Sequence, residues 1–200
     1  MLRILFLISL LYPFQLFADL INYSPPTRGG DSARVDTSSR GVCPAHPNLS
    51  TSFKVQLIAP DHVAHTISAR PKLYWKASSL INGQFEINIT EESDGWNFVE
   101  PLIEKTIIKN VSGLQHFSLA QMRVNLERDK VYRWGVSLVC DQTEPALNIG
   151  QSALIKYVAR DDGGNTAKSL ASNGIFYDAF DKASRRQRIK LLEQINLAFY

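Results

Sequence analysis

The stretch Val131-Tyr-Arg-Trp-Gly-Val-Ser-Leu-Val-Cys-Asp141 decides the fold of this chain. Its apolar side chains recur with a period of two, which is typical of a half-buried β-strand. They are Tyr132, Trp134, Val136, Leu138 and Cys140. The stretch has no reactive group of side chains, so it indicates architecture rather than activity.

Similar strand patterns lie on both sides of this stretch, and turn signals separate them. We expect the dipeptide Asn82-Gly83 to form a turn before one of these strands. The expected strands cover residues 53–57, 72–76, 85–90, 105–111, 114–119, 131–140 and 153–158. This pattern predicts a mainly β protein, an immunoglobulin-like antiparallel β-sandwich.

Tyr132 has a second interpretation that bears on the fold. It follows Leu126 and the polar run 127–130, and it opens the apolar row. It is either a tyrosine corner, whose hydroxyl bonds the backbone a few residues upstream, or simply an aromatic residue that begins a strand.

The spacing becomes helical after residue 166. Leu170 and Ala171 predict a short helix that ends at Asn173-Gly174. A second apolar row predicts one amphipathic helix at the C-terminus, through Phe176, Phe180, Ala183, Gln187, Leu191 and Ile195. The basic residues between Lys182 and Lys190 lie mostly off this row. They are either solvated or contact anionic lipid or an acidic partner.

Residues 1–18 have the features of a secretory signal peptide. Arg3 precedes an apolar run, and Ala18 ends the segment before Asp19. A membrane-spanning helix needs roughly 20 apolar residues, and Pro13 and Gln15 interrupt this segment. Cleavage is therefore favoured over a retained anchor. We expect export to the periplasm or the extracellular space, with no integral membrane span after signal cleavage.

The rest of the chain divides into three parts. Residues 19–42 are rich in Ser, Pro and Gly and predict a flexible N-terminal segment. Residues 43–160 form the expected β-sandwich domain. Residues 161–200 form the expected C-terminal helical extension, packed on the sandwich.

Charge and cysteine content constrain the partners. Without residues 1–18 the chain has 21 basic and 19 acidic side chains, a formal charge of +2. It lacks the concentrated basic patch of a nucleic-acid-binding protein, so we expect no nucleic-acid partner. Its two cysteines, Cys43 and Cys140, predict one disulfide in an oxidising compartment. The alternative is two free buried thiols.

The candidates for chemistry are few. Asp61, His62 and His65 fall in one expected loop, where they form an Asp–His pair, a metal site, or ordinary loop residues. The chain has neither a Gly-x-Ser-x-Gly nor a His-Glu-x-x-His motif. Residues 161–165 are read as a turn rather than a calcium loop. We therefore expect no catalytic residue, metal or cofactor.

The three tryptophans are expected to differ in role. Trp75 and Trp134 lie in apolar rows of strands and are expected in the core. Trp96 follows the turn signal Ser93-Asp94-Gly95, so it is the candidate for an exposed aromatic that stacks on a sugar ring.

Four motifs together resemble a bacterial family catalogued as domain of unknown function 928. They are Arg40–Ala45, Arg70-Pro71, Tyr132–Asp141 and Gly174–Ala179, in that order. Phe176 departs from the family pattern, in which Trp is common. The resemblance implies an exported bacterial domain with a β-rich body and a helical end. It supplies no catalytic residue.

The leading functional hypothesis is a non-enzymatic, exported binding or scaffolding domain of the bacterial envelope, whose partner is an envelope protein or a glycan. The first alternative is a carbohydrate-binding module that uses Trp96. The second is a hydrolase built around Asp61 and His62.

Overall fold

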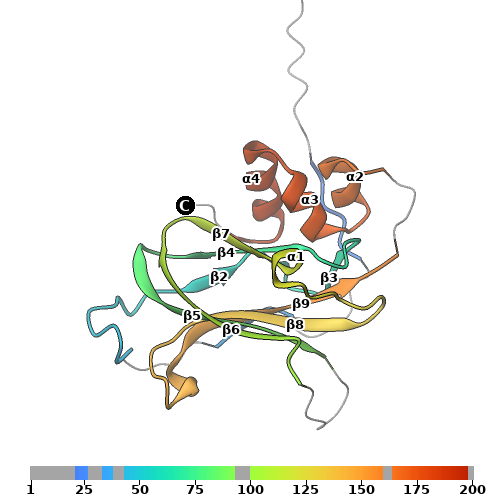
Figure 1. Ribbon diagram of the computed structural model, residues 1–200. Helices are drawn as coiled ribbons and strands as arrows, with labels where there is room; N and C mark the ends of the chain where they lie inside the picture. Colours follow the sequence, from blue (N-terminus) through green and yellow to red (C-terminus); the bar gives the residue numbers. More distant parts are fainter. Residues whose placement is uncertain (1–20, 27–32, 38–42, 93–99, 160–163, 198–200) are drawn as a thin grey trace, which may run out of the picture.

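The computed structural model describes residues 21–26, 33–37, 43–92, 100–159 and 164–197 of the 200-residue chain. Two β-sheets face each other, and helices cover one side of the pair (Figure 1). The strands are β1 (Val35–Asp36), β2 (Val55–Leu57), β3 (Ala64–Thr66), β4 (Lys72–Ala77), β5 (Ile81–Glu91), β6 (Ile103–Val111), β7 (Leu114–Ser118), β8 (Val131–Leu138) and β9 (Ile149–Tyr157). The helices are α1 (Leu119–Met122), α2 (Ala167–Ser172), α3 (Phe176–Lys182) and α4 (Arg185–Gln194), with a 3₁₀ turn η1 (Pro145–Leu147).

The larger sheet has six strands in the order β1-β9-β8-β5-β6, and β3 also pairs with β9. Strands β1 and β3 share one edge of β9, and β3 runs parallel to it. The smaller sheet is antiparallel, in the order β2-β4-β7. The prediction of a mainly β protein with antiparallel sheets and C-terminal helices is confirmed. The short strands β1 and β3 were not predicted.

The core lies between the two sheets and beneath the helices. Trp75 of the smaller sheet contacts Phe85 of the larger one, with ring centroids 4.9 Å apart. Trp134 meets Phe117 at 5.8 Å. Because both tryptophans are at most 1% exposed, their predicted place in the core is confirmed. Aromatic rings of this size provide much of the buried apolar area.

The tyrosine-corner interpretation is confirmed. The hydroxyl of Tyr132 accepts a hydrogen bond from the backbone N–H of Glu127, at 3.0 Å. The ring itself is buried. The contact fixes the entry of the chain into β8, the strand at the centre of the larger sheet.

The expected turn at Asn82-Gly83 is wrong, because both residues lie inside β5. They pair with Asn110 and Lys109 of β6. Gly83 is required for space rather than for a turn conformation. A Cβ atom there would lie 2.6 Å from a methyl carbon of Leu138.

The single C-terminal helix is also a wrong prediction, because the chain breaks between α3 and α4. Ala183 has extended dihedral angles. Ser184 then caps α4 by accepting a hydrogen bond from the N–H of Gln187, whose side chain bonds back to Ser184. This capping box starts a new helix in the middle of the apolar row. The predicted end of α2 at Asn173-Gly174 is confirmed.

The described parts of the N-terminal segment contact the helices and the larger sheet. Residues 21–26 lie against the helices, and residues 35–36 form β1. Ser24 donates its backbone N–H to the carbonyl oxygen of Ala171. Gly174 permits this approach, since a Cβ there would lie 3.0 Å from the Ser24 carbonyl oxygen. Ile21 and Tyr23 are buried, and this apolar contact offsets the entropy of ordering the segment.

Candidate functional site

The hydrogen bonds that the structure shows for the residues proposed for a hydrolase lead to other partners. The hydrogen-bond partner of His62 Nε2 is the hydroxyl of Tyr23, at 2.7 Å, and the two rings stack. The Asp61 carboxylate accepts from the backbone N–H of Arg34. His65 lies on β3 opposite Lys156, not in the expected loop.

A pocket of about 360 Å³ opens beside His62. The described residues that line it provide no hydroxyl or thiol nucleophile apart from the Tyr23 phenol, and burial raises the pKa of that phenol. Burial and the neighbouring His65 lower the pKa of His62, which favours the neutral imidazole. The Tyr23–His62 contact therefore holds the N-terminal segment on the body of the protein.

The His62 contact predicts a pH dependence of stability. Because the pKa of His62 in the folded chain lies below its ordinary value of 6.5, the unfolded chain binds more protons there. The contribution of neutral His62 to the free energy of unfolding is complete above pH 6.5. It is lost as the pH falls from 6.5 through the pKa of His62 in the folded chain. We expect a smaller decrease of Tm in that window for His62→Gln than for the wild type, measured by thermal melts at each pH. Parallel profiles for the two proteins contradict this prediction.

The side chains of Asp178 and Tyr177 connect α3 to the strands through hydrogen bonds. The Asp178 carboxylate accepts hydrogen bonds from the Thr66 hydroxyl, at 2.7 Å, and from the backbone N–H of Ile67. Burial nevertheless raises the pKa of Asp178. The Tyr177 hydroxyl accepts from the indole N–H of Trp134 and donates to the carbonyl of Leu154. These polar groups have internal partners, so their role is structural.

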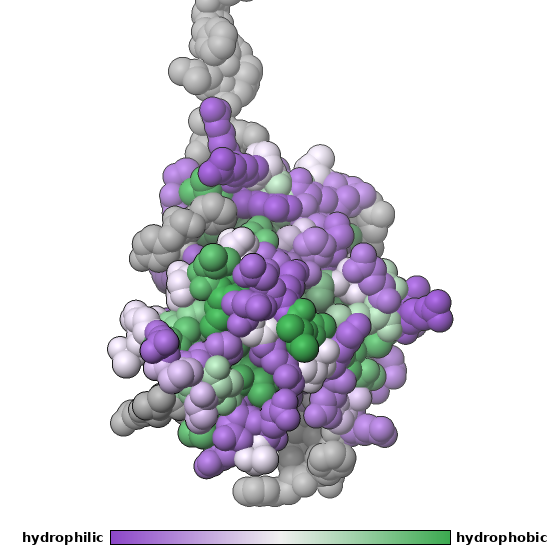
Figure 2. All heavy atoms as spheres, turned by 60° about the vertical axis from the view of Figure 1, so that its left-hand side comes forward, coloured by the Kyte–Doolittle hydropathy of each residue, from purple (hydrophilic) through white to green (hydrophobic). Residues whose placement is uncertain are grey.

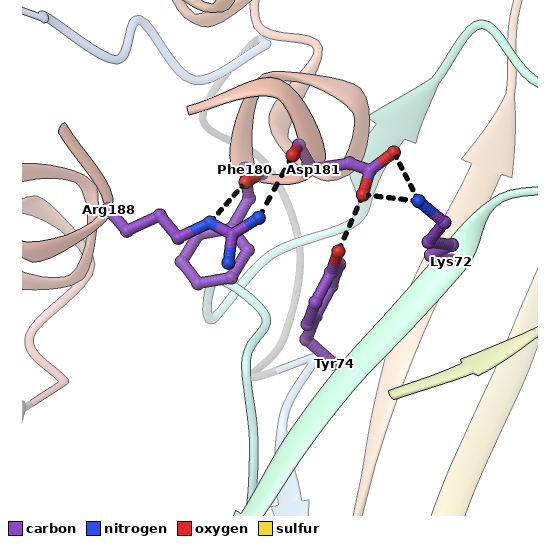
Figure 3. Close-up of polar contacts among 5 residues, drawn as sticks. All are labelled: Lys72, Tyr74, Phe180, Asp181 and Arg188. Carbon is purple, nitrogen blue, oxygen red and sulfur yellow. Dashed lines mark hydrogen bonds and ion pairs between the residues drawn. The ribbon is translucent and has the colours of Figure 1, made fainter. Parts of the chain in front are cut away.

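A second polar cluster ties α3 to β4 and α4 (Figure 3). Asp181 accepts from the Tyr74 hydroxyl at 2.5 Å and forms an ion pair with Lys72 at 3.1 Å. Burial opposes ionisation of Asp181, but these hydrogen bonds hold its pKa below the ordinary value. The Arg188 guanidinium donates to the carbonyl oxygens of Phe180 and Asp181, and so caps the last turn of α3.

The end of the sandwich that carries the disulfide differs from these two polar clusters, because several side chains around the disulfide are exposed to solvent. Cys43 and Cys140 form the predicted disulfide, across 97 residues of sequence. The backbone N–H of Ala45 bonds to the carbonyl of Cys140, whose own N–H bonds to the buried Asn148 side chain. The loops that meet here are therefore joined by the disulfide and by hydrogen bonds.

Two neighbouring hollows, of about 230 and 360 Å³, form a groove at this end. We call it the disulfide-end groove and define it by the residues common to both hollows, Ala45, His46 and Asn82. Leu80 lines one hollow and Ile108 the other. They are the most exposed large apolar side chains of the described residues, at 69% and 82%. Figure 2 brings this end forward and shows hydrophobic patches between hydrophilic residues.

The groove also has polar walls. Amide side chains line it at four positions, Asn48, Asn82, Gln84 and Gln142. Asp141 stands beside them and accepts hydrogen bonds from Thr143, which lower its pKa. Carboxamides both donate and accept hydrogen bonds, so this wall suits a polar backbone or a hydroxylated ligand.

A third hollow, of about 370 Å³, lies on the outer face of the larger sheet. Its polar lining includes Glu86, Asn88, Glu104 and Arg133. Arg133 is held by two hydrogen bonds to Glu92, at 2.9 and 3.0 Å. The lining offers carboxylates, an amide and a guanidinium, which are groups that bind sugar hydroxyls. The predicted sugar-stacking residue Trp96 lies outside the described residues.

Sequence reasoning did not identify the groove or the Tyr23 contact. One signal for the groove was present, because Ile107 and Ile108 are adjacent in β6 and a strand must turn one of them outward. The alternation of Ile21 and Tyr23 was a weaker signal for the N-terminal contact. The predicted disulfide placed residues near 45 beside residues near 141, but nothing local indicated that Asn82 would join them.

The fold and the groove define the chain as a disulfide-linked β-sandwich domain with a helical cover. The family model of the Domain of Unknown Function (DUF928) matches residues 35–194, and the chain belongs to this family. No curated protein matches the chain. Among the described residues, no helix combines the length and the apolar character needed to cross a membrane.

Proposed function

We propose that this protein is an exported, non-enzymatic binding domain of the bacterial envelope, and that the disulfide-end groove holds an extended segment of an envelope protein. The observation that carries the proposal is the exposure of Leu80 and Ile108 beside a groove whose loops are cross-linked by the disulfide. Contiguous exposed apolar surface that is rimmed by polar groups marks interaction sites. The disulfide and the absence of a membrane-spanning helix among the described residues are consistent with a protein that acts outside the cytoplasm.

The chemistry of the groove favours a peptide segment as its occupant. Leu80 and Ile108 provide apolar contact area, which is the usual source of affinity at protein interfaces. Asn82, Gln84 and Gln142 supply donors and acceptors that match a peptide backbone. The disulfide and the hydrogen bond to Asn148 constrain the loop at Cys140, which reduces the entropy that is lost on binding.

The test is capture from a detergent-solubilised envelope extract by residues 19–200 immobilised on a resin. We expect the double variant Leu80→Ser/Ile108→Ser to capture about one tenth or less of the amount of a partner protein that the wild type captures. The matched control is Val35→Ser/Leu102→Ser, which removes two exposed apolar side chains from outside the groove. Equal loss in both double variants, or no specific capture by the wild type, rejects the proposal. So does a hydrolytic activity that disappears in His62→Gln.

A second candidate function is carbohydrate binding at the outer face of the larger sheet. The polar hollow with Asn88 and Arg133 favours it. Strands β5 and β6, which contribute to this hollow, are also the two strands joined by the segment that contains Trp96. Calorimetric titration with purified envelope glycans tests it, with Asn88→Ala and Trp96→Ala as variants. Glycan binding that both variants leave unchanged, or no glycan binding, removes this candidate.

A further inference from the structure

The positive charge of this protein is concentrated in its C-terminal helices. Residues 164–197 contain six basic and three acidic side chains, whereas the rest of residues 19–200 contains 15 basic and 16 acidic ones. The net charge of +2 therefore separates into +3 on the helices and −1 elsewhere. Such an asymmetry indicates a charged interaction surface rather than general solubility.

Four of the five exposed basic side chains in residues 164–197 lie on α3 and α4, and the fifth is Lys168 of α2. We call the four on α3 and α4 the basic surface and define it by Lys182, Arg185, Arg186 and Lys190. Lys190 pairs with Glu193 at 2.7 Å, and within the described part of the chain the other three form no ion pair. In Figure 2 hydrophilic residues gather at the top of the molecule, where Figure 1 places these helices.

Two of these residues stand where they lower helix stability. Arg185 and Arg186 are the first two residues of α4, and the helix dipole disfavours cations in the first turn. The aliphatic residues Leu191 and Leu192 hold α4 on the core from its opposite side. Side chains that oppose local stability without a structural partner point to a function in binding.

The described start of the N-terminal segment is bound to the same helices. The Gln194 side chain accepts from the backbone N–H of Tyr23 and donates to the carbonyl of Ile21, which binds the segment to the end of α4. Only Asp19 and Leu20 separate Ile21 from the expected signal peptide. Two extended residues span at most about 7 Å, so the expected signal peptide would bring this end of the helices close to the bilayer until it is cleaved.

We propose that the helical layer is the membrane-facing side of this protein, and that the basic surface binds the anionic headgroups of a phospholipid bilayer. The charge asymmetry supplies the attraction, and the attachment of residues 21–24 to α2 and α4 gives the orientation. The disulfide-end groove and the outer face of the larger sheet then remain accessible to envelope partners. The proposal goes beyond the proposed function, because it concerns a different surface and does not depend on the groove.

The experiment is co-sedimentation of residues 19–200 with vesicles of phosphatidylcholine, with or without phosphatidylglycerol. We expect binding only to the anionic vesicles, decreasing as the salt concentration rises. Arg185→Glu/Arg186→Glu should weaken binding roughly tenfold or more, since each basic residue near a membrane surface contributes to affinity. The same variant should melt at an equal or higher temperature than the wild type, because acidic residues suit the first turn of a helix.

The matched control is Lys105→Glu/Lys109→Glu on β6, which changes the net charge by the same amount on the opposite sheet. Retention of vesicle binding by this control, together with its loss in the α4 variant, supports the proposal. Equal weakening in both variants means that only total charge matters and overturns it. Equal binding to both kinds of vesicle, or no binding to anionic vesicles, also overturns it.

Discussion

Replacing both Cys43 and Cys140 by serine is expected to lower the free energy of unfolding by about 3 to 5 kcal/mol. The disulfide joins residues 97 positions apart, so its loss frees a long loop in the unfolded chain. Both cysteines are buried, and the serine hydroxyls would replace sulfur atoms in an apolar setting. Urea unfolding of the double variant and the wild type, followed by far-UV circular dichroism, measures the difference.

Reduction provides the control for this prediction. Wild-type protein unfolded in the presence of a reductant should approach the stability of the double serine variant, because both lack the cross-link. Alkylation without reductant should label no thiol in the folded or unfolded wild type. An unchanged unfolding midpoint for the double variant would show that the cross-link adds no stability.

Phe176→Ala is expected to destabilise the protein by about 3 to 5 kcal/mol and to loosen the helices from the sheets. The Phe176 ring is fully buried and stands among three other aromatic rings. Its centroid lies 5.3 Å from Tyr23, 5.9 Å from Tyr177 and 6.0 Å from Phe180. Truncation leaves a cavity where the N-terminal segment, α3 and the core meet.

A more conservative substitution at position 176 distinguishes the effect of lost packing from an effect that any substitution there would have. Phe176→Leu keeps much of the buried apolar volume, so we expect a clearly smaller loss than for Phe176→Ala. Proteolysis should cut the N-terminal segment faster in the alanine variant, since Tyr23 loses a packing partner. Identical unfolding midpoints for the alanine variant and the wild type would contradict the central role of this ring.

The fold was largely predictable because strand periodicity is a local property. The apolar row from Tyr132 to Cys140 lies in or directly after β8, and its side chains face the core as the alternation requires. The disulfide was predictable for a different reason, since two cysteines allow only one intramolecular pair. The strands that were missed, β1 and β3, have two and three residues and depend on the edge of β9 for their hydrogen bonds.

The errors share a physical cause, which is that a local signal was overruled by a tertiary contact. Asn82-Gly83 is a turn signal in isolation, but β6 supplies backbone partners that keep it extended. The composition of the N-terminal segment indicates flexibility, yet the side chain of Gln194 holds Ile21 and Tyr23 on the helices. Ser184 is the exception, because its capping pattern with Gln187 was present in the sequence and was masked by a continuous apolar row.

The sequence by itself determined the sandwich class, the disulfide and the family. Strand periodicity and short motifs can be read within single segments, and two cysteines allow only one intramolecular pair. Only the tertiary structure decided where a partner can bind. The disulfide-end groove joins Ala45, Asn82 and Asp141, which are far apart in the chain and meet because β5 pairs with β8 and the disulfide holds the Ala45 loop against them. Exposure is decided in the same way, since Ile107 and Ile108 are alike in sequence and differ only in the face of β6 that each one occupies.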